Sequence, residues 1–102
     1  MTNYQIAFDV ICHSLHVSKK SIVSRSRLGP LVEARNMFIL LLSEDGYRDE
    51  PLAWLLNRSR SMIYIARKTA YRHLEGSKVF RNKYSKIKAA YEKRKSLRES
   101  AS

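Results

Sequence analysis

The sequence predicts an all-α protein that folds as one domain. Only three glycines and two prolines occur in 102 residues, whereas a turn-rich β architecture needs such residues every ~8–12 positions. Apolar residues recur at intervals of three and four along several segments, which is the spacing of one face of an α-helix. The length and the 44% hydrophobic content allow a buried core. We expect a helical domain over residues 1–95 and a frayed tail over residues 96–102.

The first half of the chain predicts three helices. Thr2 and Gln5 have the spacing of a capping box, and the first helix continues behind them with apolar residues at helical spacing: Tyr4, Ala7, Phe8, Ile11 and Leu15. Ser18 is expected to cap a short second helix within residues 17–23. Residues 24–30 have a loop composition that ends in Pro30, which suits the first turn of the next helix. That third helix, residues 31–43, is apolar enough to be buried, and Gly46 is expected to end it.

The second half predicts three more helices. Asp49 is expected to cap a short helix over residues 51–56, and residues 57–59 are expected to form a tight turn. Ser59 can cap a fifth helix that runs to about Glu75 and ends at Gly76. Ser77 can cap a final helix over residues 78–95, whose apolar positions should pack onto the domain: Val79, Phe80, Tyr84, Ile87 and Tyr91.

The fifth predicted helix has two different faces. A narrow apolar stripe belongs to the core and contains Ile63, Ala66, Ala70 and Leu74. A separate face is basic and aromatic, contains Arg60, Tyr64, Lys68 and Tyr71, and is flanked by Ser61 and Arg72. Met62 lies between the faces and is expected to belong to the core. Two helices joined by three residues, the second with a basic outer face, are typical of a helix-turn-helix over residues 52–74.

In that arrangement the first residues of the second helix enter the major groove of DNA. Arg60 and Ser61 stand at this position, and an arginine can bond guanine through two hydrogen bonds. A helical hairpin with a basic outer face also occurs without DNA binding, and Tyr64 and Tyr71 could pack at a helix edge instead. Both interpretations are open from spacing alone.

The positive charge is concentrated in one half of the chain. Residues 1–56 carry six basic and six acidic side chains, whereas residues 57–102 carry fourteen basic and three acidic ones. The whole net charge of +11 therefore comes from the second half. Such asymmetry indicates a polyanionic partner, because each neutralised phosphate releases condensed counterions.

Residues 26–36 read S-R-L-G-P-L-V-E-A-R-N, and residues 55–63 read L-L-N-R-S-R-S-M-I with Leu52 as the leading apolar residue. With these two segments, residues 6–87 resemble the C-terminal DNA-binding domain of the bacterial replication initiator DnaA. That family has S-R-x-R-x-I-V-x-A-R-Q in the first segment, where Arg27 and Arg35 match the first and last arginines of the pattern. It has L-G-R-D-H-[ST]-T-V in the second, at the start of the recognition helix. The resemblance implies a Trp-repressor-like helical bundle with a helix-turn-helix. It also implies that Arg27 enters the minor groove with help from Arg25.

The resemblance further implies sequence-specific binding of double-stranded DNA in replication initiation or its regulation. Arg58 matches the family's arginine at the turn and Ser61 its Ser/Thr position, whereas Ser59, Arg60 and Met62 replace Asp, His and Thr. These three replacements predict a changed preferred sequence. The residues expected to contact DNA are Arg25, Arg27, Arg58, Ser59, Arg60, Ser61, Tyr64 and Lys68.

Other kinds of site are not predicted. The chain has no G-x-x-x-x-G-K-[ST] loop, so we expect no nucleotide binding and no cofactor. The three histidines, His13, His16 and His73, have no evident acidic or cysteine partner. We therefore expect neither a catalytic site nor a metal site, and no enzyme.

Three alternatives and the location follow from composition. A transcriptional regulator of the same fold and a basic helical RNA-binding module both fit the charge. Residues 78–95 could lie on an anionic membrane, but packing of their apolar positions onto the domain is the simpler explanation, so we expect no membrane partner. The longest apolar run, residues 37–42, is far shorter than the ~20 residues of a membrane span. The single cysteine, Cys12, cannot form an internal disulfide, so we expect a cytoplasmic protein. The oligomeric state stays open.

Overall fold

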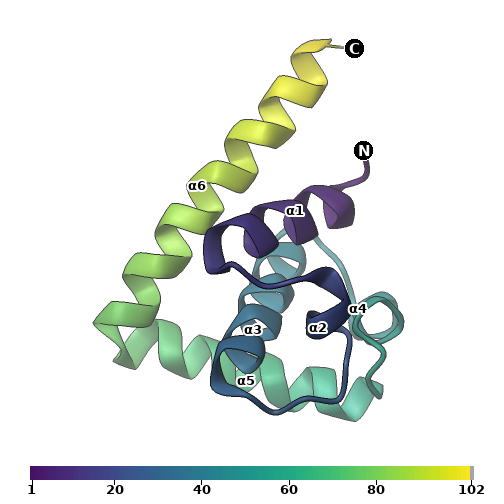
Figure 1. Ribbon diagram of the computed structural model, residues 1–102, viewed down its shortest axis with the longest axis vertical. Helices are drawn as coiled ribbons and strands as arrows, with labels where there is room; N and C mark the ends of the chain where they lie inside the picture. The colour runs from purple at the N-terminus through teal and green to yellow at the C-terminus, as the bar shows by residue number, and fades with distance from the viewer. Residues whose placement is uncertain (102) are drawn as a thin grey trace.

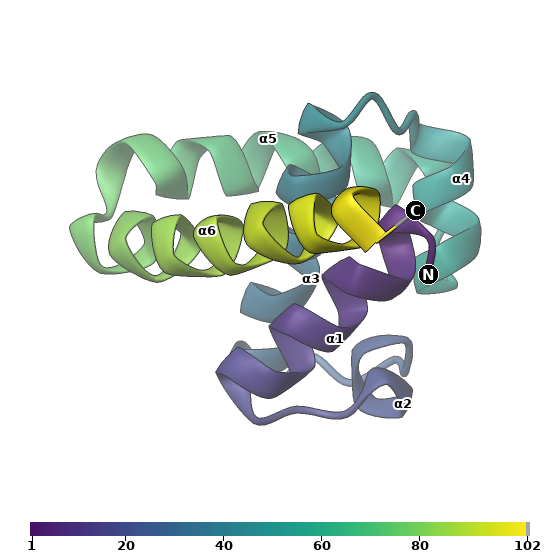
Figure 2. The same cartoon turned by 90° about the horizontal axis from the view of Figure 1, so that it is seen from above.

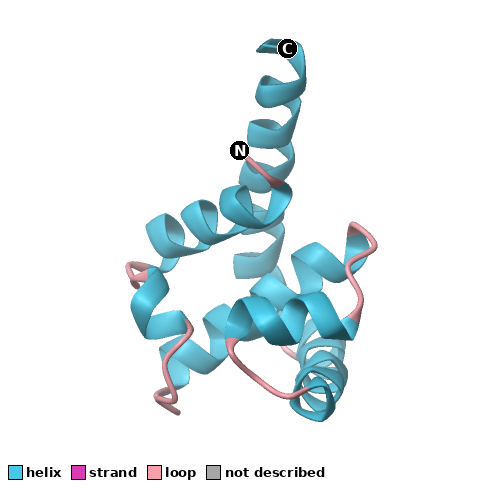
Figure 3. Cartoon of the chain, turned by 90° about the vertical axis from the view of Figure 1, so that its right-hand side faces the viewer, coloured by secondary structure: helices cyan, strands magenta, loops and turns pink. Residues whose placement is uncertain are grey.

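The computed structural model describes residues 1–101, which form six α-helices and no strand (Figure 3). The predicted all-α class is therefore confirmed. The helices are α1 (Asn3–Leu15), α2 (Lys19–Ile22), α3 (Gly29–Glu44), α4 (Asp49–Leu56), α5 (Arg60–Gly76) and α6 (Lys78–Ala101).

Helix α3 is the centre of the fold. It packs against α1, α2, α4 and α5, and every residue from position 34 to position 42 is buried. A helix that is apolar on nearly all sides must be surrounded by other helices, as the sequence predicted for this segment. Phe38 of α3 also packs against Phe8 of α1, with ring centroids 4.2 Å apart.

Helices α5 and α6 form the two arms of a V that meet at Gly76 and Ser77 (Figure 1). Seen from above, the two arms run in nearly opposite directions (Figure 2). Helices α1 and α3 fill the space between them, since α1 packs on α6 and α3 packs on α5. This arrangement leaves the side of α5 that faces away from α3 at the surface.

Local capping sets where most helices begin. The Thr2–Gln5 capping box is present in both directions, and three serine hydroxyls accept backbone N–H groups as predicted. These are Ser18 from Ser21 at 3.0 Å, Ser59 from Met62 at 3.2 Å and Ser77 from Phe80 at 3.2 Å. Gly46 follows the end of α3 with a φ of 91°, a left-handed conformation that favours glycine.

The predictions for one residue of α4 and one residue of α6 were wrong. Asp49 does not cap α4, because Arg48 occupies that position and no side chain caps the helix. The Asp49 carboxylate instead forms an ion pair with Arg67 of α5. Val79 is 66% exposed, whereas the other four apolar positions predicted for α6 are buried.

Helix α6 continues to Ala101, past the expected end at Lys95 and through the segment expected to be frayed. One contact with the N-terminal region lies just before these extra turns and one lies within them. Arg94 pairs with Asp9 of α1 at 3.4 Å, and the Arg98 guanidinium donates to the Met1 carbonyl at 2.8 Å.

Two tyrosines fasten α6 to the end of α3. The Tyr84 hydroxyl donates to Glu44 at 2.7 Å, and the Tyr91 hydroxyl donates to Asp45. Burial, followed by these carboxylate neighbours, raises the pKa of both phenols well above the usual value. Lys95 adds a bond to Asp45 at 2.9 Å.

Among residues 1–101, no helix is both long enough and apolar enough to cross a membrane.

Candidate nucleic-acid interface

The connection between α4 and α5 is short and well defined. Helix α4 ends at Leu56 and α5 begins at Arg60, so the predicted three-residue turn is confirmed. Asn57 ends α4 in the left-handed conformation, with φ 55°, which asparagine tolerates better than most residues. The Ser59 hydroxyl is engaged as the cap of α5. The turn therefore fixes where the first residues of α5 emerge.

The outer face of α5 is exposed as predicted. Ile63 and Ala70 are buried against the core, and four predicted contact residues lie at the surface: Arg60, Ser61, Tyr64 and Lys68. The Lys68 ammonium lies 4.8 Å from the centroid of the Tyr64 ring, close enough for a cation–π interaction. These two residues therefore form one mixed basic and aromatic patch.

Met62 and Ile65 of α5 also lie at this surface, although the sequence did not predict either of them there. Met62 is 49% exposed, so its expected place in the core was wrong. Ile65 is 62% exposed and was assigned no role. An apolar residue between polar positions of an amphipathic helix was the signal that could have identified Ile65.

The basic loop, residues 24–28, is held in place by a buried arginine. Arg35 of α3 is only 8% exposed, and its guanidinium donates to four backbone carbonyls. These belong to Ile22 at 2.6 Å, Ser26 at 2.7 Å, Ser24 at 2.9 Å and Ser21 at 3.3 Å. Burial, and then the nearby Arg58, lower the pKa of Arg35, although an arginine keeps its charge in a protein. Arg35 is therefore a structural residue of the loop.

Arg58 connects the same loop to the turn. Its guanidinium donates to the Ser24 carbonyl, and also to the carbonyls of Leu56 at 3.2 Å and Asn57 at 3.1 Å. The predicted DNA contact through Arg58 would have to share this guanidinium with three internal acceptors. Arg58 therefore positions the basic loop against the turn, in addition to its predicted role as a DNA contact.

Arg25 and Arg27 are the exposed cations of the basic loop. No carboxylate in the part of the chain that the structure describes pairs with either of them. Their backbone is anchored by the Arg35 and Arg58 contacts at Ser24 and Ser26. Both side chains are therefore presented from a fixed loop.

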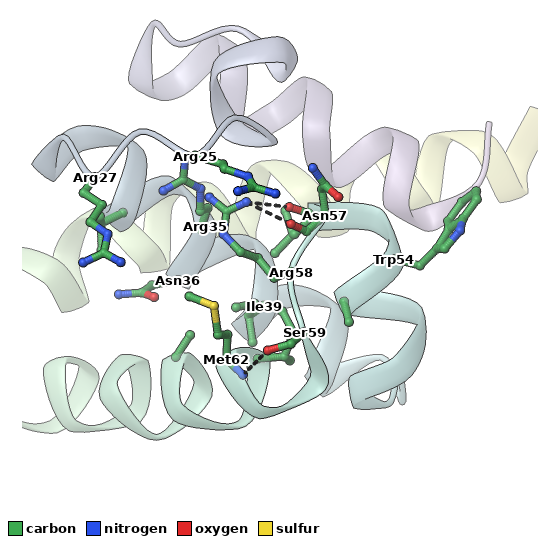
Figure 4. A pocket seen from close by; sticks show the side chains of 15 residues that line it. Arg25, Arg27, Arg35, Asn36, Ile39, Trp54, Asn57, Arg58, Ser59 and Met62 are labelled. Atoms are coloured by element: carbon green, nitrogen blue, oxygen red, sulfur yellow. Dashed lines mark hydrogen bonds between the residues drawn. The ribbon is translucent and has the colours of Figure 1, made fainter.

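Residues of the N-terminal half of α5 line two hollows. The first has a volume of about 860 Å³ and lies between α5, α4, α3 and the basic loop (Figure 4); its lining includes Arg25, Arg27, Arg58, Ser59 and Met62. The second has a volume of about 1190 Å³, and its lining includes Arg60, Ser61, Tyr64 and Ile65. The two hollows share no lining residue.

Asn36 is a further polar group of the first hollow that had no assigned role. It belongs to the apolar helix α3 and is 4% exposed, and it lines the hollow beside Ile39 and Met62 (Figure 4). A polar residue inside an apolar run was the signal available in the sequence.

Ion pairs connect the acidic residues of the first half of the chain with basic residues of the second half. Five of the six acidic residues of the first half pair with basic residues of the second half: Asp9 with Arg94, Glu33 with Lys83, Glu44 with Lys88, Asp45 with Lys95, and Asp49 with Arg67. Four of these pairs involve cations of α6. The cations that pair with no carboxylate among residues 1–101 include Arg25 and Arg27 on the basic loop, Arg60, Lys68 and Arg72 on α5, and Lys78, Arg81, Lys86 and Lys93 on α6.

The eight predicted contact residues therefore fall into two groups. Arg25, Arg27, Arg58 and Ser59 surround the first hollow, and Arg60, Ser61 and Tyr64 line the second, with Lys68 beside Tyr64. Within residues 1–101, no cluster of three His, Cys, Asp or Glu side chains could hold a metal ion. No protein-family model, curated protein or solved structure matches this chain, so the resemblance to the initiator domain stays a prediction.

Proposed function

We propose that this chain is a sequence-specific double-stranded DNA-binding domain. In this proposal α4 and α5 act as a helix-turn-helix, α5 enters the major groove, and the basic loop reaches the adjacent minor groove. Arg60 and Ser61 meet base edges, whereas Arg25, Arg27 and Lys68 meet phosphates or the minor groove.

The exposed outer face of α5 is the observation that carries this proposal. A B-DNA major groove is ~12 Å wide and admits one α-helix. Arg60, Ser61, Tyr64 and Lys68 are exposed on α5. Arg60 and Ser61 stand in its first turn, where recognition helices meet bases.

The anchoring of the basic loop supports simultaneous contact with two grooves. Arg58 joins the loop to the turn before α5, and Arg35 joins it to α3. Arg27 therefore has a fixed relation to Arg60 before DNA is bound. Preorganisation of this kind lowers the entropy cost of binding.

The resemblance to the initiator domain supports a role in replication initiation or its regulation. Ser59 retains the helix-capping function but removes the carboxylate of the family's Asp. Loss of an acid that accepts from base amino groups, with gain of an arginine at position 60, favours a guanine-containing site. A transcriptional regulator that docks on DNA in the same way would use this surface equally well.

The same geometry favours duplex DNA over the RNA and membrane alternatives. The major groove of A-form RNA is deep and narrow and does not admit a helix such as α5. The membrane alternative depended on the basic charge of α6, and four of its cations pair with carboxylates of α1 and α3.

Competition binding tests the proposal. A duplex selected from a random pool would be labelled and challenged with random duplex DNA, structured RNA and anionic vesicles. We expect the selected duplex to compete best, and Arg60→Ala to reduce its advantage over random duplex. Lys86→Ala, which removes an exposed cation of α6, is the matched control and should bind like wild type.

Equal competition by RNA or vesicles, with Arg60→Ala indistinguishable from wild type, would contradict the proposal. A loss of binding confined to Lys86→Ala would move the interface to α6.

A further inference from the structure

Ile65 occupies an unusual position on α5. The core stripe of this helix lies along Ile63 and Ala70, whereas Ile65 is 62% exposed on the opposite side. Single exposed apolar residues are common on protein surfaces, so exposure alone carries no function. The residues that share its face of the helix indicate a function for this position.

Ile65 lies in the middle of an outward line of polar residues. Ser61, Ile65, Lys68 and Arg72 are spaced by four, three and four residues, which places them on one face of an α-helix, and all four are exposed. Ile65 also lines the second hollow together with Arg60, Ser61 and Tyr64. It is one turn, ~5.4 Å, beyond Ser61, a distance on the scale of one to two base steps.

The chemistry of isoleucine restricts what it can recognise there. Its side chain has no hydrogen-bond donor or acceptor, so it cannot read the polar edges of bases. The only apolar group that a base pair presents in the major groove is the C5-methyl of thymine. Isoleucine in a helix is also held in one dominant rotamer, so packing against a methyl group costs it little conformational freedom.

We propose that Ile65 is a specificity-determining residue that packs against the methyl group of a thymine next to the bases met by Arg60 and Ser61. This inference rests on the proposed function, because it requires α5 to lie in the major groove. It assigns a guanine to the first turn of α5 and a thymine to the second. The predicted site therefore contains these two bases close together.

Replacement of thymine by deoxyuridine tests the inference one methyl group at a time. Deoxyuridine keeps every hydrogen-bonding group of thymine and lacks only the methyl. In the selected duplex, we expect one such replacement to weaken wild-type binding about fourfold, the effect of burying one methyl-sized group. Ile65→Ala should lose at least as much affinity for the thymine duplex and should bind both duplexes equally.

Arg60→Ala is the matched variant on the same helix and should keep the fourfold penalty. Ile65→Ala should melt like wild type, because the side chain is exposed and alanine is the better helix former. Ile65→Val provides a second variant that keeps a branched side chain and should retain most of the discrimination.

Three results would overturn the inference. These are a selected site without thymine, a selected duplex in which no deoxyuridine replacement weakens wild-type binding, and a penalty that persists in Ile65→Ala. Selective duplex binding in any of these cases would leave the proposed function intact. Wild-type protein that does not distinguish the selected duplex from random DNA would instead refute both.

Discussion

Arg35 and Arg58 donate hydrogen bonds to the same backbone carbonyl, that of Ser24. The two arginines come from α3 and from the turn between α4 and α5, and Ser24 begins the basic loop. Like charges so close together repel, and Arg58 contributes after burial to the lowered pKa of Arg35. The bonds to backbone carbonyls offset that repulsion, and the shared carbonyl couples the loop to the start of α5.

Removal of the Arg35 guanidinium should destabilise the protein. Arg35→Ala leaves four carbonyls without this donor. Hydrogen bonds to charged groups contribute a net ~1.5–3 kcal/mol each, and water that reaches the freed carbonyls restores part of the loss. We expect a loss of about 3 kcal/mol in the free energy of unfolding, measured by urea denaturation. Arg35→Lys should be intermediate, since an ammonium cannot reproduce the planar fork of donors.

Arg25→Ala is the control for this experiment, because Arg25 is exposed, and its unfolding curve should match that of wild type. If Arg35→Ala unfolds at the same urea concentration as wild type, Arg35 does not hold the loop.

Arg58 and Arg27 should affect DNA binding by different routes. Arg58→Ala frees the basic loop from the turn, so we expect faster amide hydrogen exchange at residues 24–28 together with weaker binding. Arg27→Ala removes an exposed side chain and should weaken binding with unchanged exchange. If the amides of residues 24–28 exchange at the same rate in both variants, Arg58 does not position the loop.

Arg60 and Arg27 should divide specificity and affinity between them. Arg60→Ala should cost ~1–3 kcal/mol on the preferred duplex and relax the preference at one base position. Arg27→Ala should weaken binding but keep the major-groove preference, with its largest effect where A·T pairs narrow the minor groove. Selection of bound sequences with each variant measures both effects. Unchanged binding by both variants, with wild-type melting, would show that the proposed docking is wrong.

The dependence of affinity on salt should be steep and should come from α5 and the basic loop. With ~6 phosphate contacts, the slope of log affinity against log salt concentration should lie near −5. Lys68→Ala should make this slope less negative by about 0.9, whereas Lys86→Ala on α6 should leave it unchanged. A wild-type slope near zero would remove the electrostatic basis of the proposal.

Alkaline pH should destabilise the contact between α3 and α6. The pKa values of Tyr84 and Tyr91 are raised in the folded protein, so above about pH 10 the unfolded chain loses two protons that the folded chain keeps. The free energy of unfolding should therefore fall as the pH rises through this range, by up to ~2.7 kcal/mol per pH unit from the two phenols. The paired Lys88 and Lys95, whose pKa values are also raised, add a dependence of the same sign.

The variant with Tyr84→Phe and Tyr91→Phe isolates the contribution of the phenols. Its urea unfolding, measured between pH 8 and pH 11 in roughly half-unit steps, should show a shallower decline than that of wild type. Tyr64→Phe at the exposed surface of α5 is the control. A decline as steep as wild type in the double variant would assign the alkaline loss to other groups.

Most helix starts could be predicted because capping is a local property of the chain. Thr2, Ser18, Ser59 and Ser77 each accept an N–H group only three residues away, so their roles depend little on the rest of the fold. The failures involved partners far along the sequence. Asp49 pairs with Arg67 instead of capping, and Arg98, in the extra turns of α6, donates to the Met1 carbonyl.

The sequence by itself determined the all-helical class, the short turn before α5 and the polar face of that helix, since 3.6-residue periodicity and capping operate within a few residues. Only the tertiary structure decided which charges remain available. It buried Arg35, turned Arg58 toward Ser24 and paired four cations of α6 with distant carboxylates. The physical reason is that an ion pair or a shared carbonyl depends on the distance between two segments that lie far apart in the sequence. Local periodicity and capping carry no information about that distance.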